Sequence, residues 1–503
     1  MADDLALAPL ARSDTVGTSN GPVRGYLEDG LKVFKGLRYG APPVGALRFK
    51  PPARPDAWTE AADATAYGAP AIQSGMAAGE RGSSPGDPPA PDEPGSSEDC
   101  LFLNVWTPAT DDARRPVMVW LHGGGFANGS GGAAMYDGGA LARKGDVVTV
   151  TVNHRLNVFG YLHLGEVFGP DYAQSGVAGM LDIVQALEWV RDNIAAFGGD
   201  PGDITIFGES GGGWKVSLLL AMPGARGLFH KAIIQSGPGL TAKPVADADR
   251  TARALLEKLG VKTAAELAAV PTDHLSRTSI TVGADVMRLY APVLDGVAIP
   301  RHPFEPDAAP LNADVPVLIG TNKDESTLFL LGHPRFGDFT DDDVMKQAKA
   351  AAGDRADALL AALRRAYPDY SPTHIGAAAQ TVGNMWINSV RLAERKATQG
   401  SAPVYMYMLT WETPVSRGRL KSPHAVEIPL VFDNVEKARN FVGRGDDPQV
   451  VADQMSDAWL ACARTGDPGW PAYDASRRAT MMFNVESGVQ DDPLPEIRAL
   501  LNG

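Results

Sequence analysis

The chain has 503 residues, of which 44% are hydrophobic and 21% are charged, a composition typical of a globular protein with a large buried core. A formal net charge of −14, with no basic stripe, argues against nucleic-acid binding, and no apolar window approaches the length of a membrane span. Cys100 and Cys462 lie far apart and outside any metal-ligand spacing, so we interpret both as free thiols.

The N-terminal part predicts a start without a signal peptide and then a small β region. Met1-Ala2-Asp3-Asp4-Leu5 has acids where a signal peptide needs a basic start, so we expect a cytoplasmic protein, although a trimmed secreted chain would begin in the same way. Residues 15–39 alternate β-formers with turn signals, which predicts an antiparallel hairpin region. Residues 75–97 are rich in Gly, Pro and Ser and predict a mobile loop, with a specific lid as the alternative.

A glycine run follows the first strongly apolar strand. Residues 116–121 are almost continuously apolar, which is typical of a strand buried on both faces of a sheet. The strand leads into His122-Gly123-Gly124-Gly125-Phe126. Because glycines leave successive N–H groups unobstructed, this run has the form of one half of an oxyanion hole.

The centre of the chain contains the pattern G-x-S-x-G. Gly208-Glu209-Ser210-Gly211-Gly212 follows a β-branched run and precedes an apolar run of helical length, which is the strand, turn and helix context of a nucleophile elbow. Gly208 and Gly212 leave room for so tight a turn, and the N–H of Gly211 would face an oxyanion. Five letters alone could recur by chance among 55 glycines, so the rest of the chain decides.

Strands and helices alternate along the chain, which predicts an α/β fold with a large, mostly parallel sheet covered by helices. We expect one domain over 1–503, with helical excursions over 247–284 and 341–367 that build the walls of the site. In such sheets ligands bind at the carboxyl ends of the strands.

An acid and a histidine follow two later strands. Asp324 and Glu325 come after the strand beginning at residue 315, and His424 lies in the loop after the strand 404–411. Serine, acid and histidine in this order are typical of the α/β-hydrolase triad. Of nine histidines, His424 alone has this context; we interpret His122 and His154, which are near the motifs, as hydrogen-bonded packing.

In these motifs the chain resembles the type-B carboxylesterases, the family that includes the cholinesterases. The similarity runs from residue 33 to residue 473. Its most specific pieces stand in the family's order: Ser97-Glu98-Asp99-Cys100-Leu101, Gly123-Gly124-Gly125-Phe126, Phe207-Gly208-Glu209-Ser210-Gly211-Gly212, Asn322-Lys323-Asp324-Glu325 and His424-Ala425-Val426-Glu427-Ile428.

The resemblance assigns the site residues. It implies Ser210 as nucleophile, Glu325 as acid with Asp324 as its rival, and His424 as base. The implied oxyanion hole consists of the backbone N–H groups of Gly124, Gly125 and Gly211. Four further residues are expected to support the site or line the substrate: Glu209, Ser236, Trp214 and Phe126. We expect the Glu209 side chain to leave the turn in a different direction from that of Ser210.

Several departures from the family pattern narrow the prediction. Residues 69–72 lack the cysteine that many secreted members bond to the position of Cys100, and the enclosed loop lacks the tryptophan with which cholinesterases hold a quaternary ammonium, so a cholinesterase is not expected. Gly211 replaces the usual alanine, and Trp214 and Lys215 stand where small residues are usual.

The expected function is therefore hydrolysis of a small-molecule ester through an acyl-enzyme. This mechanism implies no metal or organic cofactor, and the charge and the apolar pattern described above predict no nucleic-acid partner and no membrane span. A monomer and a dimer both stay open. Amide or thioester hydrolysis stays open as a side activity, and a catalytically silent adhesion protein is the alternative class, against which the complete set of catalytic positions argues.

A basic cluster precedes His424. Arg417, Arg419 and Lys421 stand out in an acidic chain, and Lys215 follows the nucleophile. Two interpretations stay open: a solvated face, which such a run typically forms, or a lining that favours esters bearing a carboxylate.

Overall fold

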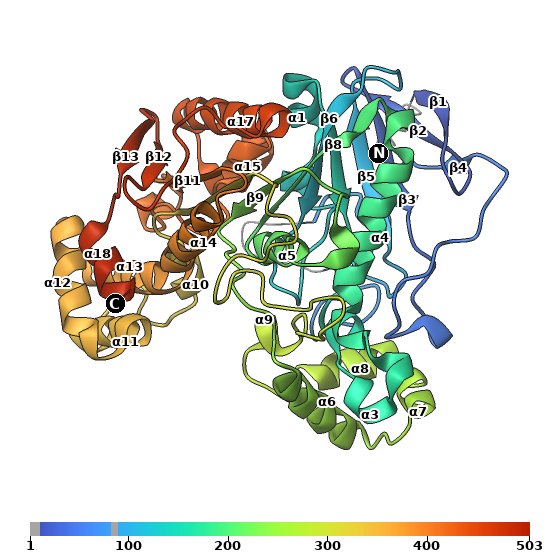
Figure 1. Ribbon diagram of the computed structural model, residues 1–503, viewed down its shortest axis with the longest axis horizontal. Coiled ribbons are helices and arrows are strands. Elements are labelled where there is room, and N and C mark those ends of the chain that lie inside the picture. Colours follow the sequence, from blue (N-terminus) through green and yellow to red (C-terminus); the bar gives the residue numbers. More distant parts are fainter. Residues whose placement is uncertain (1–10, 82–88, 503) are drawn as a thin grey trace, which may run out of the picture.

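A 13-stranded sheet forms the centre of the computed structural model, which describes residues 11–81 and 89–502 (Figure 1). Its middle strands run parallel, in the order β7 (Val148–Val152), β6 (Arg115–Leu121), β8 (Gly199–Glu209), β9 (Lys231–Gln235), β10 (Val317–Asn322), β11 (Val404–Leu409) and β12 (Ala479–Phe483). The mostly parallel sheet predicted from the sequence is confirmed.

Antiparallel strands extend the sheet at both edges. One edge holds β1 (Arg12–Gly17), β2 (Pro22–Glu28), β3 (Leu31–Arg38) and β5 (Phe102–Thr107), with the short β4 (Ala62–Asp63) beside β2. The other edge ends in β13 (Gly488–Asp491). The predicted N-terminal hairpin region is confirmed. This one sheet takes strands from both ends of the chain, and the single domain over 1–503 stays a prediction.

The strands are apolar on both sides because each face of the sheet packs against helices. In β6, Val117, Val119 and Leu121 belong to one hydrophobic cluster, whereas Met118 and Trp120 belong to another. This alternation is the two-residue period of a strand. The first cluster includes residues of α4 (Ala178–Asn193), α5 (Gly211–Leu219) and α14 (Ile387–Gln399); the second includes residues of α1 (Gly139–Gly145), α15 (Ile428–Val431) and α17 (Asp447–Thr465).

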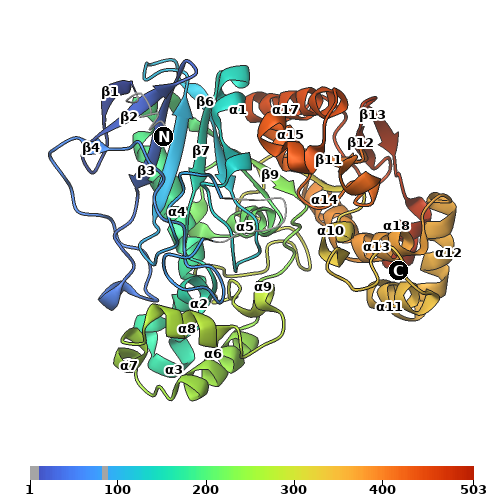
Figure 2. The ribbon, with the colours of Figure 1, turned by 180° about the vertical axis from the view of Figure 1, so that it is seen from behind.

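Two groups of helices project from the sheet, as Figures 1 and 2 show from opposite sides. The first group contains α3 (Gly165–Phe168), α6 (Val245–Leu259), α7 (Ala264–Ala268) and α8 (Thr272–Ser279). The second contains α10 (Ser326–Leu330), α11 (Asp341–Ala352), α12 (Ala356–Ala366), α13 (Pro372–Thr381) and the C-terminal α18 (Pro495–Asn502). The predicted helical patterns over 247–284 and 341–367 fall in these two groups.

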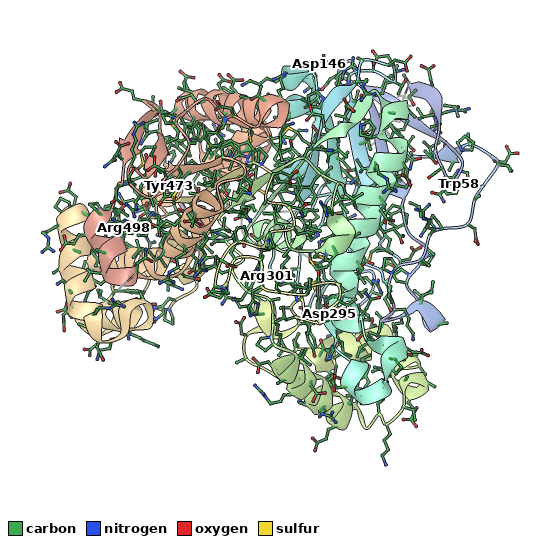
Figure 3. All side chains as sticks on the ribbon, in the orientation of Figure 1. Trp58, Asp146, Asp295, Arg301, Tyr473 and Arg498 are labelled. Carbon is green, nitrogen blue, oxygen red and sulfur yellow. The ribbon has the colours of Figure 1, made fainter. Side chains whose placement is uncertain are left out.

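The remaining segments are loops with short helices. These helices are α2 (Asn157–Tyr161), α9 (Val286–Leu289) and α16 (Arg439–Val442). Asp295 and Arg301, labelled in Figure 3, lie in the long segment between α9 and β10. Residues 82–88 of the loop predicted over 75–97 lie outside the described residues, as do Met1 to Leu5, so the expectations about both stay predictions. Among the described helices, none has the length and apolarity needed to cross a membrane.

Candidate active site

The residues predicted for the site meet at the carboxyl end of the parallel strands. Gly123 to Gly125 follow β6, Ser210 follows β8, and Ser236 follows β9. Glu325 comes three residues after the end of β10, and His424 lies in the loop after β11. Parallel strands bring these ends to one edge of the sheet, although the residues are up to 301 positions apart.

The turn between β8 and α5 is strained at Ser210. This residue has φ 54° and ψ −120°, a backbone conformation that residues other than glycine rarely adopt. A Cβ placed on Gly212 would lie 1.9 Å from the Leu121 carbonyl oxygen, and one on Gly208 would lie 2.6 Å from the backbone of Gly212. The two glycines therefore make the tight turn possible, as the sequence predicts.

The predicted base and acid are in contact. Nδ1 of His424 lies 2.6 Å from Oε2 of Glu325, and both side chains are buried. The other oxygen of Glu325 accepts the N–H of Asn322 at 2.7 Å. The rival acid, Asp324, instead accepts the Tyr370 hydroxyl at 2.8 Å and the Ser422 N–H at 3.2 Å. Between the two neighbouring acids, the geometry favours Glu325.

Glu209 approaches the same histidine from the other side. Its Oε1 lies 3.0 Å from Nε2 of His424. A Cβ placed on Gly123 would lie 2.8 Å from Oε2 of Glu209 and 3.4 Å from Cβ of Ser210, so both side chains border Gly123. Glu209 thus contacts the predicted base, which fits the expectation that it supports the site. That its side chain leaves the turn in a different direction from that of Ser210 stays a prediction.

Charge around His424 favours its protonated form. Burial alone would lower the pKa of this imidazole, but the carboxylates of Glu209 and Glu325 outweigh it and raise the pKa above the ordinary value. A further buried acid, Glu427, accepts Asn322 Nδ2 at 2.5 Å, and its pKa is raised to about 7, first by burial and then by Glu325. Glu427 stands in the motif that begins at His424, but no pattern in the sequence predicts a role for it.

The glycine run adopts a backbone that other residues avoid. Gly124 has φ 78° and Gly125 has φ 61°. A Cβ on Gly124 would lie 2.4 Å from the Asn128 carbonyl oxygen. Gly125 also lies close to Gly211, whose added Cβ would be 2.2 Å from the Gly125 carbonyl oxygen. The backbones of the three glycines predicted for the oxyanion hole are thus brought together at Ser210.

A cavity of about 560 Å³ opens at this point. Ser210, Gly125 and Gly211 line it, together with three of the predicted lining residues, Phe126, Trp214 and Ser236. The rings of Phe126 and Trp214 meet edge to face at 5.5 Å between centroids. Glu209 is not among its lining residues but contacts His424, as described above.

Two of the other walls come from segments that follow the two expected excursions in the chain. Asp285, Met287 and Arg288 lie at α9, after 247–284, while a row of amides comes from the helical stretch beyond 341–367. This row consists of Gln380, Asn384 and Asn388. Phe329 lines the cavity as well, and its ring lies 4.7 Å from that of His424. Spacing of four along a helix is the only signal in the sequence that links the amides.

The basic cluster before His424 lies outside the lining of the cavity. The described lining of the cavity includes none of Arg417, Arg419 and Lys421. Arg419 donates to the Phe336 carbonyl, and Lys421 pairs with Glu412 at 2.8 Å. Lys215 is fully buried and binds backbone carbonyls. The arrangement therefore favours the solvated-face interpretation of the cluster over a lining that binds carboxylates.

His122 and His154 form a buried stack. Their rings lie 4.7 Å apart and nearly parallel, and each Nδ1 lies 3.0 Å from a backbone carbonyl oxygen. Burial, followed by the nearby Lys215, lowers the pKa of both imidazoles. These contacts agree with the interpretation as hydrogen-bonded packing. Within the part of the chain that the structure describes, no cluster of three or more potential metal ligands occurs, and both cysteines are free.

Comparisons with known proteins extend over nearly the whole chain. Residues 12–493 match the Carboxylesterase family. The chain is 36% identical to para-nitrobenzyl esterase of Bacillus subtilis (strain 168), over 97% of this chain and 98% of that protein. It is 37% identical to phenmedipham hydrolase of Pseudarthrobacter oxydans, over 93% and 94%. Among solved structures, the Geobacillus stearothermophilus carboxylesterase EST55 at pH 6.2 superposes with a TM-score of 0.84 at 39% identity, over 97% of this chain and 100% of that chain.

Proposed function

The chain belongs to the carboxylesterase family and hydrolyses carboxylic esters, and from this premise we propose that it does so through an acyl-enzyme on Ser210, with His424 as base and Glu325 as acid. The observation that carries the proposal is the 2.6 Å contact between His424 Nδ1 and Glu325 Oε2 beside the strained serine turn. Of the two carboxylate contacts of His424, the one on Nδ1 is the shorter, and it favours the tautomer whose Nε2 can accept a proton when that nitrogen turns from Glu209 Oε1, at 3.0 Å, to Ser210.

In the first half-reaction, Nε2 of His424 takes the proton of Ser210 as Oγ adds to the ester carbonyl. The carbonyl oxygen becomes an oxyanion, which the N–H groups of Gly124, Gly125 and Gly211 stabilise. The intermediate then expels the alcohol, which receives the proton from Nε2. In the second half-reaction, water adds to the acyl group in the same way and releases the acid and the free serine.

Competition between water and methanol tests the acyl-enzyme. If every ester of one acid passes through the same acyl-Ser210, added methanol must yield methyl ester and free acid in one fixed ratio. We expect the same ratio for p-nitrophenyl, phenyl and benzyl esters of that acid. A ratio that changes with the leaving group would indicate direct attack on the ester and contradict the mechanism.

The pH profile reports the carboxylates around His424. The base acts only when it is neutral, so kcat/KM for a neutral ester should increase with pH. Because the pKa of His424 is raised, the midpoint of this increase should lie above the ordinary imidazole value of about 6.5. Glu209→Gln removes one of the three carboxylates that raise this pKa, those of Glu209, Glu325 and Glu427, so we expect the midpoint to fall by roughly one unit or more.

The matched control for this shift is Glu412→Gln. Glu412 pairs with Lys323 and Lys421, and neither of these contacts involves His424. The control should keep the wild-type midpoint. A Glu209→Gln profile with an unchanged or higher midpoint would refute the electrostatic role of Glu209.

Trp214 is expected to limit the size of the ester. Its side chain lines the cavity beside Phe126, so Trp214→Ala enlarges the space next to Ser210. Since each methylene accommodated in an apolar pocket contributes about 1–3 kcal/mol, we expect kcat/KM for long esters to rise at least ~10-fold relative to short ones. A panel that varies acyl and alcohol length separately shows which part of the substrate Trp214 contacts.

Trp58→Ala serves as the control for this substitution. Trp58 Nε1 donates to the Pro22 carbonyl at 2.8 Å, much as Trp214 Nε1 donates to the Thr241 carbonyl at 3.1 Å. Figure 3 labels Trp58 beside the N-terminal strands, away from α5. The control should leave the length preference unchanged. If Trp214→Ala also leaves it unchanged for both series, Trp214 does not restrict the substrate.

A further inference from the structure

Lys215 is a fully buried lysine on α5, the helix that follows Ser210. Its Nζ donates to the carbonyl of His122 and to that of Gly125, each at 3.0 Å. These two carbonyls lie on either side of Gly123 and Gly124 in the chain. One side chain from the nucleophile helix therefore ties together the two ends of the glycine run.

The bonds of Lys215 complete a set that fixes every peptide of the run. The Gly123 carbonyl lies 3.0 Å from Nδ1 of His122, and the Gly124 carbonyl accepts the N–H groups of Ala127 and Asn128 at 3.2 and 3.0 Å. Only the carbonyls of His122 and Gly125 depend on Lys215. Because each peptide is planar, a bonded carbonyl also fixes the N–H of the following residue. Lys215 thus fixes the two peptides that flank those of the Gly124 and Gly125 N–H groups, whose own carbonyls are bonded within the loop.

Gly211 makes this approach of the loop to the helix possible. A Cβ on Gly211 would lie 2.2 Å from the oxygen and 2.5 Å from the Cα of Gly125. Alanine at this position would therefore push Gly125 away from α5, and so away from Lys215. Gly211 and Lys215 therefore act together. The glycine leaves room for the loop directly against the helix, and the lysine bonds to the loop.

We propose that Lys215 is a positioning residue of the oxyanion hole, which holds the glycine run against α5 so that the N–H groups of Gly124 and Gly125 face the oxyanion at Ser210. The inference rests on the proposed function, since it concerns the same hole. It adds a residue whose side chain is not expected to touch the substrate but anchors the backbone on both sides of the two donors that do.

The surroundings of Lys215 suit this role at neutral and alkaline pH. The charged and titratable groups that face it are Glu209, His122 and His154, and the Phe126 ring centroid lies 5.5 Å from Nζ. Burial lowers the pKa of Lys215 to about 7, and Glu209 opposes this shift. A neutral amine carries two N–H groups, which match the two carbonyls, so the bonds persist without the charge.

The first test is Lys215→Met, which keeps the length of the side chain and removes its donors. We expect kcat to fall about 10- to 100-fold, less than or similar to the loss of one oxyanion donor, while KM stays within about 3-fold. The second readout is an aryl trifluoromethyl ketone. Ser210 Oγ adds to its carbonyl, the serine proton passes to His424, and the resulting oxyanion occupies the hole. Its inhibition constant should rise by the same factor as kcat falls.

The matched control is Lys396→Met. Lys396 is also buried, and its Nζ binds the Ala313 carbonyl at 2.7 Å and Gln399 Oε1 at 3.0 Å, away from the cavity lining. This control should keep the wild-type kcat and inhibition constant even where its thermal stability falls. If Lys215→Met also keeps both values, or if only its KM changes, Lys215 does not position the hole.

Gly211→Ala keeps the inference testable where Lys215→Met is poorly folded, and a double-mutant cycle tests it further where both variants fold. Gly211→Ala alone should lower kcat, because its Cβ displaces the loop that Lys215 holds. In Gly211→Ala/Lys215→Met the loop is free to move, so we expect a loss smaller than the product of the two single losses. Strictly multiplicative losses would overturn the inference. A leaving-group-dependent methanol ratio in the wild type would instead overturn the proposed function itself.

Discussion

Ser210→Ala should abolish ester hydrolysis, with a loss in kcat of roughly 10⁴- to 10⁶-fold, and leave the fold intact. The substitution removes the only atom that forms the acyl-enzyme, while the oxyanion donors and the cavity remain. Alanine has the same backbone preferences as serine at φ 54°, so the strain of the turn is unchanged. The measurement is kcat on p-nitrophenyl esters, with thermal unfolding of both proteins recorded alongside.

Ser456→Ala is the matched control. Ser456 is a buried serine on α17, and its hydroxyl donates to the Ala452 carbonyl at 2.6 Å. Its removal should cost about 1 kcal/mol of stability and leave kcat close to that of the wild type. Substantial turnover by pure Ser210→Ala would show that another group is the nucleophile.

Glu325→Gln should lower kcat by about 10³- to 10⁴-fold, the second largest effect that we expect. Glutamine has the shape of glutamate but no charge, so the imidazolium formed in the transition state loses its partner at 2.6 Å. Its amide N–H₂ also favours the tautomer in which Nδ1 accepts, which leaves Nε2 protonated and unable to act as base.

Asp324→Asn distinguishes the roles of the two neighbouring acids, Asp324 and Glu325. Asp324 is buried and bonded to Tyr370 and Ser422, so this variant should lose stability but keep kcat within about 10-fold. The measurements are kcat and the unfolding midpoint of both variants. The reverse order of losses in kcat would reassign the acid to Asp324.

Much of the fold could be predicted because its signals are local. The strand β6 is apolar on both faces, and α4 repeats its apolar residues with helical spacing, so each pattern identifies its own element. The G-x-S-x-G turn is equally local, since the glycines are required by atoms within a few residues and by the adjacent strand. Long helices escaped prediction where burial on several sides removes the periodic face: α13 is buried at most of its positions, and so is much of α17.

The acid and the histidine could be predicted from their order, but not their contacts. Asp324 and Glu325 are neighbours, and only the geometry at the start of α10 directs one of them to His424. The contact of Glu209 with His424 likewise joins the end of β8 to the loop after β11. No local pattern contains such information, because it arises from the packing of separate strands.

The walls of the cavity and the role of Lys215 were also outside the reach of the sequence. Arg288, on α9, and Asn384, between α13 and α14, reach the cavity from two separate segments, whose positions depend on tertiary packing. Lys215 is a charged residue that composition alone assigns to a surface, yet the two carbonyls of the glycine run satisfy its amine inside the protein.

The most direct test of the central claim is to identify the residue that reacts with a fluorophosphonate. Only a serine whose proton is taken by a neighbouring base attacks this probe at phosphorus and expels fluoride. We predict one adduct per chain, on the peptide that contains Ser210, with loss of ester hydrolysis in proportion to labelling. Labelling of a different residue, or full inhibition with Ser210 unmodified, would contradict the assignment of Ser210 as the nucleophile.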